Sequence, residues 1–286
     1  MEEKRFYYKK KLGQNFLVDK RKREEIIILS KVSKDDYVLE IGAGSGAITK
    51  GLCEEAKYVI AVEIDKDIIP KLSENIRDFN NVSIMTEDIM SIDIFRLLNV
   101  FAKKGFIRLK DHIKVVANLP YYITSPIISK LLVMPHISEI TVMVQKEVAD
   151  RICAFPGTKN FGVLTLLCNY FGVATKVLDV PKECFYPVPK VNSTVIRIVK
   201  NTDVINLDNP NNFIIEEDED YNKLFNVIHA AFETRRKTLI NALSVVALYD
   251  KQRIHDALIK IGVDPMSRAE NLSLDDYKKL TKIISY

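Results

Sequence analysis

The chain has little of what marks secreted, metal-binding or membrane proteins. Its 286 residues include no tryptophan and only four cysteines, at positions 53, 153, 168 and 184. These cysteines have no short paired spacing, which argues against a zinc site or a disulfide framework. The four histidines are equally scattered, so the sequence predicts no metal site. No apolar run approaches the roughly 18 residues of a membrane span. Because the N-terminus is charged and lacks an apolar signal core, we expect a cytoplasmic protein.

Basic residues gather toward the two ends of the sequence. Residues 1–23 hold nine Lys or Arg against three acids, a balance of +6, and residues 221–286 hold eleven against seven, a balance of +4. The net charge is +4, which leaves −6 for the middle, mostly in the acidic run 216–220. Two basic ends suit a polyanion lying across the molecule, although a charge run is more often simply solvated.

Strand-like and helix-like patterns alternate through the first two thirds of the chain. Apolar runs typical of parallel strands occur at 37–41, 58–62, 82–85, 113–117 and 140–144. Two further segments, 173–180 and 193–199, could close the sheet as an antiparallel hairpin. Helical patterns include 20–31, where Ile26, Ile27 and Leu29 would face inward. This alternation predicts βαβ units. We therefore expect an α/β, Rossmann-like fold with a mostly parallel sheet of seven strands, one of them antiparallel.

The remainder of the chain has no strand signal. The acidic, Asn-rich stretch 201–220 is typical of a linker, and several amphipathic segments follow it. Ser273 and Asp276 have the spacing of a capping box that opens a helix. We predict a basic arm over residues 1–23, an α/β domain over 24–204 and a small all-α domain over 205–286.

The tetrapeptide Asn118-Leu119-Pro120-Tyr121 follows the predicted strand at 113–117. It therefore lies at the carboxyl edge of the sheet, where open α/β sheets bind ligands. After it, Ser125 suits the N-cap of a helix and Pro126 the first helical position. An exposed amide, a proline-fixed backbone and an aromatic ring together could grip a flat base that carries an amine. The same residues are also common in simple turns.

Glycine residues follow the first predicted strand in the pattern Gly42-x-Gly44-x-Gly46. Glycine lets a backbone approach a ligand closely. The spacing Gly42-x-Gly44-x-x-Ala47 tolerably fits a dinucleotide fingerprint. With Glu40 just before it, the turn fits the pattern of S-adenosylmethionine (SAM) binding better.

Acidic residues end the next two strands. Glu63 could accept hydrogen bonds from both hydroxyls of a ribose, and Asp88 could accept one from the amino group of an adenine. Taken alone, Asp88 could equally be a loop acid or a helix cap. With Glu40, the three acids surround one glycine turn and suit a nucleoside cofactor that has no pyrophosphate.

Together, these motifs resemble the rRNA adenine N6,N6-dimethyltransferases over nearly the whole chain and in the same order. The matching segments are Gln14–Leu17, Glu40–Gly46, Glu63-x-Asp65, Asp88, Asn118–Tyr121, Gln145–Glu147, Phe185–Val191 and Arg235–Leu239. Arg268–Ser273 is similar to the KsgA-type branch, which modifies small-subunit rRNA. The resemblance implies SAM as the cofactor, a catalytic α/β domain and a helical RNA-binding domain. Its SAM contacts fall here on Asn15, Leu17, Gly42, Gly44, Glu63, Asp88 and Asn118.

The resemblance also implies a reaction, N6,N6-dimethylation of two adjacent adenosines in a small-subunit (16S) rRNA hairpin. The Asn118 side-chain oxygen and the Pro120 carbonyl would accept hydrogen bonds from the adenine amine and localise its lone pair. The base must leave any stack. Tyr121 would then hold one face and, by the resemblance, Phe185 the other. No strong general base is needed.

Basic side chains are expected to bind RNA phosphates and add affinity rather than sequence reading. The residues predicted for this role are Lys9, Lys10, Lys11, Lys190, Arg235, Arg236 and Lys237. Structured RNA is recognised largely by shape. We therefore expect the partner to be rRNA within a pre-ribosomal particle, and we expect the protein to act as a monomer.

Three other functions compete with this prediction. A macrolide-resistance methyltransferase shares the fold and the Asn-x-x-Tyr chemistry but acts on large-subunit rRNA; Arg268–Ser273 favours the small-subunit enzyme. A binding-only assembly or transcription factor would keep the fold without turnover, and the intact Asn118, Glu63 and Asp88 argue against it. A dehydrogenase is disfavoured because Asn-Leu-Pro-Tyr has no role in hydride transfer.

Overall fold

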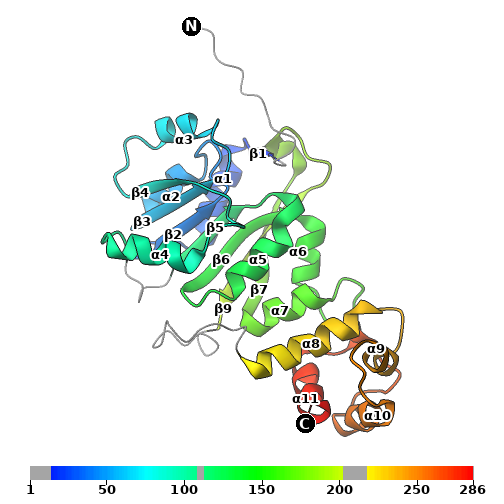
Figure 1. Ribbon diagram of the computed structural model, residues 1–286. Helices are drawn as coiled ribbons and strands as arrows, with labels where there is room; N and C mark the ends of the chain where they lie inside the picture. Colours follow the sequence, from blue (N-terminus) through cyan, green and yellow to red (C-terminus); the bar gives the residue numbers. More distant parts are fainter. Residues whose placement is uncertain (1–13, 108–112, 202–217, 286) are drawn as a thin grey trace. The chain divides into compact units, whose positions relative to one another are not determined.

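The computed structural model describes residues 14–107, 113–201 and 218–285 (Figure 1). Its contacts divide the chain into two compact units, Met1–Ala149 with Val173–Leu207, and Asp150–Gly172 with Asp208–Tyr286. The sequence predicts a single division near residue 205. The structure differs because 150–172 groups with the C-terminal helices. Lys9, Lys10 and Lys11 lie outside the described residues, as do 216 and 217 of the acidic run.

The first unit is built on a seven-stranded sheet with the order β4-β3-β2-β5-β6-β9-β7. The strands are β2 (Tyr37–Ile41), β3 (Tyr58–Glu63), β4 (Val82–Thr86), β5 (Ile113–Asn118), β6 (Ile137–Gln145), β7 (Gly172–Val180) and β9 (Ser193–Lys200). The pairs from β4 through β6 are parallel, and β9 runs antiparallel to β6. Every residue of β2 and β3 is buried, as expected for strands covered on both faces. The predicted mostly parallel sheet is confirmed.

The edge of this sheet contains the predicted hairpin. The Thr175 hydroxyl donates to the Arg197 carbonyl, and the Thr194 hydroxyl donates to the Asp179 carboxylate. The partners therefore run in opposite order along β7 and β9, which is an antiparallel arrangement.

Helices connect the strands of the first unit. They are α1 (Lys20–Ser30), α2 (Thr49–Glu55), α3 (Ile69–Asn75), α4 (Ile94–Lys103) and α5 (Thr124–Leu132), and α6 (Lys146–Ile152) crosses into the second unit. Helix α1 is capped by Asp19, whose carboxylate accepts the Lys22 N–H at 3.0 Å. Ile26 is buried as predicted, Ile27 and Leu29 are half-buried, and Ile28 is exposed.

A second, two-stranded sheet ties the N-terminal segment to a distant part of the chain. Strand β1 (Phe16–Leu17) pairs antiparallel with β8 (Phe185–Tyr186), so that Phe16 lies opposite Tyr186 and Leu17 opposite Phe185. The Val18 N–H also donates to the Cys184 carbonyl at 2.8 Å. The sequence predicts that this segment docks on the body, but not that it forms a strand.

The second unit is helical over its described residues. Its elements are α7 (Val163–Phe171), α8 (Glu219–Glu233), α9 (Leu239–Val246), α10 (Lys251–Lys260), the 3₁₀ turn η6 (Ala269–Asn271) and α11 (Leu274–Ile284). Tyr170 of α7 packs on Tyr221 and Phe225 of α8, with ring centroids 5.4 and 5.5 Å apart. This aromatic contact explains why residues 150–172 belong here.

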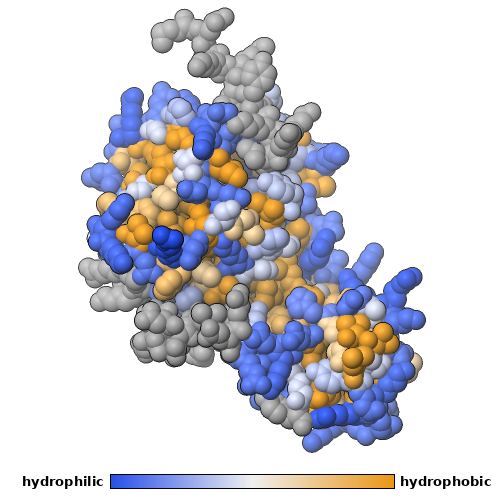
Figure 2. Space-filling view, in the orientation of Figure 1, coloured by the Kyte–Doolittle hydropathy of each residue, from blue (hydrophilic) through white to orange (hydrophobic). Residues whose placement is uncertain are grey.

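Two features complete the second unit. The predicted capping box is confirmed, since Ser273 Oγ accepts the Asp276 N–H and donates to the Asp276 carboxylate. Exposed apolar side chains gather around α9 (Figure 2), where Val245 and Leu248 are 70% and 85% exposed. Across the part of the chain that the structure describes, no helix has the length and apolar character to cross a membrane.

Candidate active site

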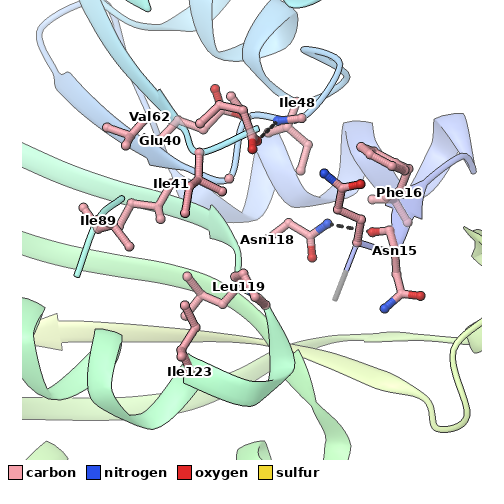
Figure 3. A pocket seen from close by; sticks show the side chains of 18 of the residues that line it. Asn15, Phe16, Glu40, Ile41, Ile48, Val62, Ile89, Asn118, Leu119 and Ile123 are labelled. Atoms are coloured by element: carbon pink, nitrogen blue, oxygen red, sulfur yellow. Dashed lines mark hydrogen bonds between the residues drawn. The ribbon is translucent and has the colours of Figure 1, made fainter. Parts of the chain in front are cut away.

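One pocket in the first unit lies at the carboxyl ends of β2, β3 and β5 (Figure 3). Its lining comes from the N-terminal segment, the glycine turn, the residues that follow β3 and β4, and the turn after β5. It brings together Asn15, Leu17, Gly42, Gly44, Glu63, Asp88, Asn118, Pro120 and Tyr121. All the predicted cofactor residues therefore lie in one cavity with the predicted catalytic tetrapeptide.

The glycine turn shows why glycine is required there. Gly42 and Gly44 have φ angles of +74° and +57°, in the left-handed region that favours glycine. A Cβ on Gly42 would lie 3.0 Å from the Asn118 carbonyl oxygen, and one on Gly44 would lie 3.1 Å from the Phe16 ring. The turn can thus approach both Asn118 and Phe16 only without side chains.

Glu63 is held at the end of β3 by backbone donors. Its carboxylate accepts the Gly44 N–H at 2.7 Å and the Asp65 N–H at 2.9 Å. Burial raises the pKa of Glu63, and these two hydrogen bonds oppose that rise. The carboxylate is therefore fixed in direction, and its remaining lone pairs are available to ribose hydroxyls.

Glu40 also lines the pocket, although the sequence indicates it only as the acid before the glycine turn. It is buried within β2, and burial, with a smaller contribution from nearby Glu63, raises its pKa to about 8. Its Oε2 atom has no hydrogen-bond partner in the structure. A buried carboxyl with one unpartnered oxygen at a pocket is a functional candidate. The signal in the sequence is one acid inside an otherwise apolar strand.

Asp88 lies in a tight turn that follows β4. Its Oδ1 accepts the Met90 N–H at 2.8 Å, and its carbonyl accepts the N–H groups of Ser91 and Ile92 at 2.9 and 3.0 Å. The turn leaves Asp88 half-buried at the pocket, beside the buried Ile89.

Asn118 is the last residue of β5, and its orientation is set by the N-terminal segment. Its Nδ2 donates to the Asn15 carbonyl at 3.2 Å (Figure 3). With the amide nitrogen engaged in this way, the side-chain oxygen is the end of the amide that remains to accept a hydrogen bond.

The start of α5 differs from the sequence prediction. A 3₁₀ turn, η2 (Tyr121–Ile123), leads directly into a helix that begins at Thr124. The prediction of Ser125 as N-cap and Pro126 as first helical residue is therefore wrong. No capping side chain is needed, because the preceding turn is already helical. Instead, the Thr124 hydroxyl and the Ile123 N–H donate to the Pro120 carbonyl at 3.0 and 3.3 Å.

Tyr121 is anchored by a residue that the sequence does not reveal. Its hydroxyl lies 2.7 Å from Ser193 Oγ at the start of β9. Ser193 is completely buried, and burial raises the pKa of Tyr121. Nothing in the local sequence links two residues separated by 72 positions.

Phe185 is not brought to the pocket. It is 1% exposed and packs in the core with Leu17, Val116 and Met143. The neighbouring Tyr186 is 54% exposed, in keeping with the alternation of a strand. The predicted stacking role of Phe185 stays a prediction, and it would require the ring to leave this packed position.

The predicted RNA-binding residues differ in their surroundings. Arg235 donates to the carbonyls of Lys159 and Phe161 at 3.0 and 2.9 Å, so it joins two segments of the second unit. Arg236 and Lys237 are exposed in the turn between α8 and α9, and Lys190 is exposed in the first unit. Over the described residues, no group of three or more His, Cys, Asp or Glu could hold a metal ion.

Comparisons with known proteins give a consistent result. Residues 5–285 match the family model described as "Ribosomal RNA adenine dimethylase". "Ribosomal RNA small subunit methyltransferase A" of Lachnoclostridium phytofermentans is 44% identical and covers 98% of this chain and 92% of its own. The protein of the same name from Caldanaerobacter subterraneus subsp. tengcongensis is 40% identical and covers 96% and 97%.

Solved structures agree with this result. A dimethyladenosine transferase from Plasmodium falciparum matches with a TM-score of 0.72 at 26% identity, over 93% of this chain and 95% of that chain. The 23S rRNA methyltransferase ErmE matches with a TM-score of 0.68 at 22% identity, over 95% and 100%, which shows a common fold.

Proposed function

Because the chain belongs to the ribosomal RNA adenine dimethylase family, we propose that it uses SAM to dimethylate N6 of two adjacent adenosines in a small-subunit rRNA hairpin. The observation that carries the proposal is the oriented Asn118 amide, which shares one pocket with the acid-flanked glycine turn. The names of the relatives support the small subunit as the substrate.

The pocket residues fit the chemical groups of SAM. Glu63 offers a fixed carboxylate to ribose hydroxyls, and Asp88 offers one to the adenine amine. Glu40 has a buried carboxyl oxygen without a hydrogen-bond partner, which suits a polar group of the cofactor. When bound, SAM supplies an electrophilic methyl group on a sulfonium that is already a good leaving group.

The protein's main chemical task is to improve the adenine amine as a nucleophile. The lone pair of that amine is delocalised into the ring, so attack requires a more tetrahedral nitrogen. The Asn118 Oδ1 accepts a hydrogen bond from the amine, localises the lone pair and stabilises the positive charge that develops. The methylated ammonium then loses its proton readily, so no strong base is required.

The same acceptor can serve both methylations. An adenine amine has two hydrogens, but after the first transfer only one remains to donate. The Pro120 carbonyl already receives hydrogen bonds from Thr124 and Ile123. In the second methylation the amine has a single N–H, which needs a single acceptor. A mechanism that relies mainly on Asn118 therefore works for both methylations.

Tyr121 provides one face for the flipped base. Its hydroxyl bond to Ser193 fixes the ring in place before the base arrives. Stacking on an aromatic side chain contributes about 1–3 kcal/mol per base. This offsets much of the few-kcal/mol cost of removing a base from its stack.

The substrate is expected to be a pre-ribosomal particle, to which the protein binds as a monomer in the cytoplasm. The exposed Lys190, Arg236 and Lys237 would contact RNA phosphates. The rival substrate is large-subunit rRNA. The overall identity to the small-subunit relatives, over 96% and 98% of this chain, favours the small subunit.

Methylation of separated subunits tests the proposal. Small and large subunits would be prepared from a strain that lacks this protein. Each would be incubated with the purified protein and methyl-labelled SAM, and the labelled adenines would be mapped. We expect two methyl groups on each of two adjacent adenosines of small-subunit rRNA. Labelling confined to large subunits would assign the protein to the rival substrate. Binding without any labelling would leave a non-catalytic assembly factor.

A further inference from the structure

Lys130 makes an unusual set of contacts for a lysine on a helix surface. From the last turn of α5, its ammonium donates to the carbonyls of Ile89 and Met90 at 2.9 and 3.0 Å, and to that of Ile92. An ammonium has three donors, and all three are directed at one short stretch of backbone. The side chain therefore caps the turn that follows Asp88.

This turn belongs to the pocket. Ile89 lines it, and Asp88 closes the turn by accepting the Met90 N–H and, through its carbonyl, those of Ser91 and Ile92. The N–H groups of the turn thus donate to Asp88, whereas the carbonyls of Ile89, Met90 and Ile92 accept hydrogen bonds from Lys130. Without Lys130, these carbonyls would have to find water or the turn would reorganise.

The contact also joins two parts of the site that the sheet keeps apart. Asp88 follows β4, whereas α5 follows β5, and strands β3 and β2 lie between them in the sheet. The catalytic tetrapeptide leads into α5 through the 3₁₀ turn η2. One side chain on this helix therefore links the turn of Asp88 to the element that begins at the catalytic turn.

Hydrogen bonds to the backbone hold the ammonium of Lys130 where it is. Burial lowers the pKa of Lys130, while Asp88 and Asp93 raise it. The net shift is downward, so the contacts that hold the ammonium at this turn are its three hydrogen bonds to backbone carbonyls. Asp93 is itself fixed as the N-cap of α4, because it accepts the Arg96 N–H at 2.9 Å.

We propose that Lys130 is a positioning residue for recognition of the adenine ring of the cofactor, because it holds the turn that aims Asp88 into the pocket. The inference rests on the proposed use of SAM and deepens it. Lys130 touches neither cofactor nor substrate in this assignment; it acts through Asp88. Its removal should weaken the binding of ligands that carry the adenine amino group and spare ligands that lack it.

The test compares two ligands and four proteins. S-adenosylhomocysteine and its hypoxanthine analogue, which lacks the amino group, would be titrated calorimetrically into wild type, Lys130→Met, Lys130→Arg and Lys114→Met. Lys114 is a matched control, since it also donates to a backbone carbonyl, that of Lys31, at 2.6 Å and does not line the pocket. Melting temperatures of all four would be recorded.

For Lys130→Met we expect about tenfold weaker binding of S-adenosylhomocysteine, the loss typical of one positioned charged hydrogen bond. The hypoxanthine analogue should bind as it does to wild type. Lys130→Arg should restore part of the affinity, and Lys114→Met should change neither ligand. If Lys130→Met does not fold, Lys130→Gln, which keeps a single donor group, takes its place.

The outcomes separate this inference from the proposed function. Equal binding of S-adenosylhomocysteine by wild type and Lys130→Met overturns the role of Lys130, and so does an equal loss for both ligands, which would indicate a general structural role. If wild type binds neither ligand, the assignment of SAM as cofactor fails instead.

Discussion

The two ends of the pocket are built in different ways. At the proposed cofactor end, Glu63 and Asp88 are held by N–H groups of their own turns or of the neighbouring glycine turn. At the base end, Asn118 and Tyr121 are held by partners 103 and 72 residues away, Asn15 and Ser193. The turns at this end are closed mainly by short-range hydrogen bonds, and Lys130 of α5 adds the long-range contact at the turn of Asp88. The base end needs the N-terminal segment and the last strands to be in place.

This difference predicts a separation of mutational effects. Changes at the base end should lower the rate of transfer while leaving cofactor affinity measurable. Changes at the cofactor end should weaken cofactor binding while leaving the rate at saturation close to that of wild type.

The largest effect is expected for Asn118→Ala. Loss of the acceptor should reduce the rate constant for methyl transfer at least tenfold and, by analogy with other single electrostatic groups, about 100-fold. Single-turnover methylation of small subunits would measure it, with binding of S-adenosylhomocysteine followed in parallel. Asn99→Ala is a suitable control, because Asn99 Nδ2 likewise donates to a backbone carbonyl, that of Phe95, at 2.9 Å. Normal turnover by Asn118→Ala would refute the mechanism.

Glu40 should produce a pH dependence of stability at the cofactor end. Its pKa in the folded protein is raised from 4.5 to about 8, so between these values the native state binds more protons than the unfolded state. The free energy of unfolding should therefore fall as pH rises from 5 to 8, by at most about 1.4 kcal/mol per pH unit from this group.

In Glu40→Gln this group no longer titrates. The free energy of unfolding of the variant should therefore increase relative to that of wild type as pH rises from 5 to 8. Urea denaturation at several pH values would measure the difference. The control is Glu87→Gln, since Glu87 lines the same pocket but is exposed. Parallel pH profiles for wild type and Glu40→Gln would show that Glu40 is already ionised in the folded protein.

A smaller effect is expected for Glu63→Gln. The variant keeps the shape of the side chain but loses the charge that suits ribose hydroxyls, so we expect roughly tenfold weaker binding of S-adenosylhomocysteine. Methyl transfer at saturating SAM should stay within about threefold of wild type. A slower rate of methyl transfer that persists at saturating SAM would mean that cofactor binding and catalysis cannot be separated in this pocket.

The smallest effect is expected for Ser193→Ala. Tyr121 would lose one hydrogen bond, worth about 1 kcal/mol, so the efficiency of methylation should fall about fivefold. Tyr121→Phe should behave similarly, and the double variant should lose no more than either single one. Thr194→Ala is the control, because the Thr194 hydroxyl bonds Asp179 instead. Additive losses would show that the hydroxyl pair does not act as a unit.

The sequence brings the residues of the proposed cofactor end together for a physical reason. Glu63, Asp88 and the glycine turn each stand at the carboxyl end of an apolar run, and parallel strands bring those ends to one edge. The strand pattern therefore suffices to place them together. Glu40 is found by the same pattern, but its unpartnered oxygen is visible only in the structure.

The base end and the second unit depend on contacts between distant segments. Whether Phe185 faces a ligand or the core is decided by its pairing opposite Leu17. Arg235 is basic in sequence like Arg236, yet its guanidinium is directed at the carbonyls of Lys159 and Phe161. The error at Ser125 has a more local cause, because a 3₁₀ turn replaced the expected cap.

The bond from Asn118 to the Asn15 carbonyl has a practical consequence. The amide that would activate the substrate is aimed by a backbone oxygen from outside the large sheet, in a segment fastened by a pair of two-residue strands. Proteolytic clipping ahead of Val18 would remove this oxygen together with Asn15 and Leu17, which line the pocket, so both cofactor binding and methyl transfer should fall. Affinity tags and fusion partners are therefore better attached at the other terminus.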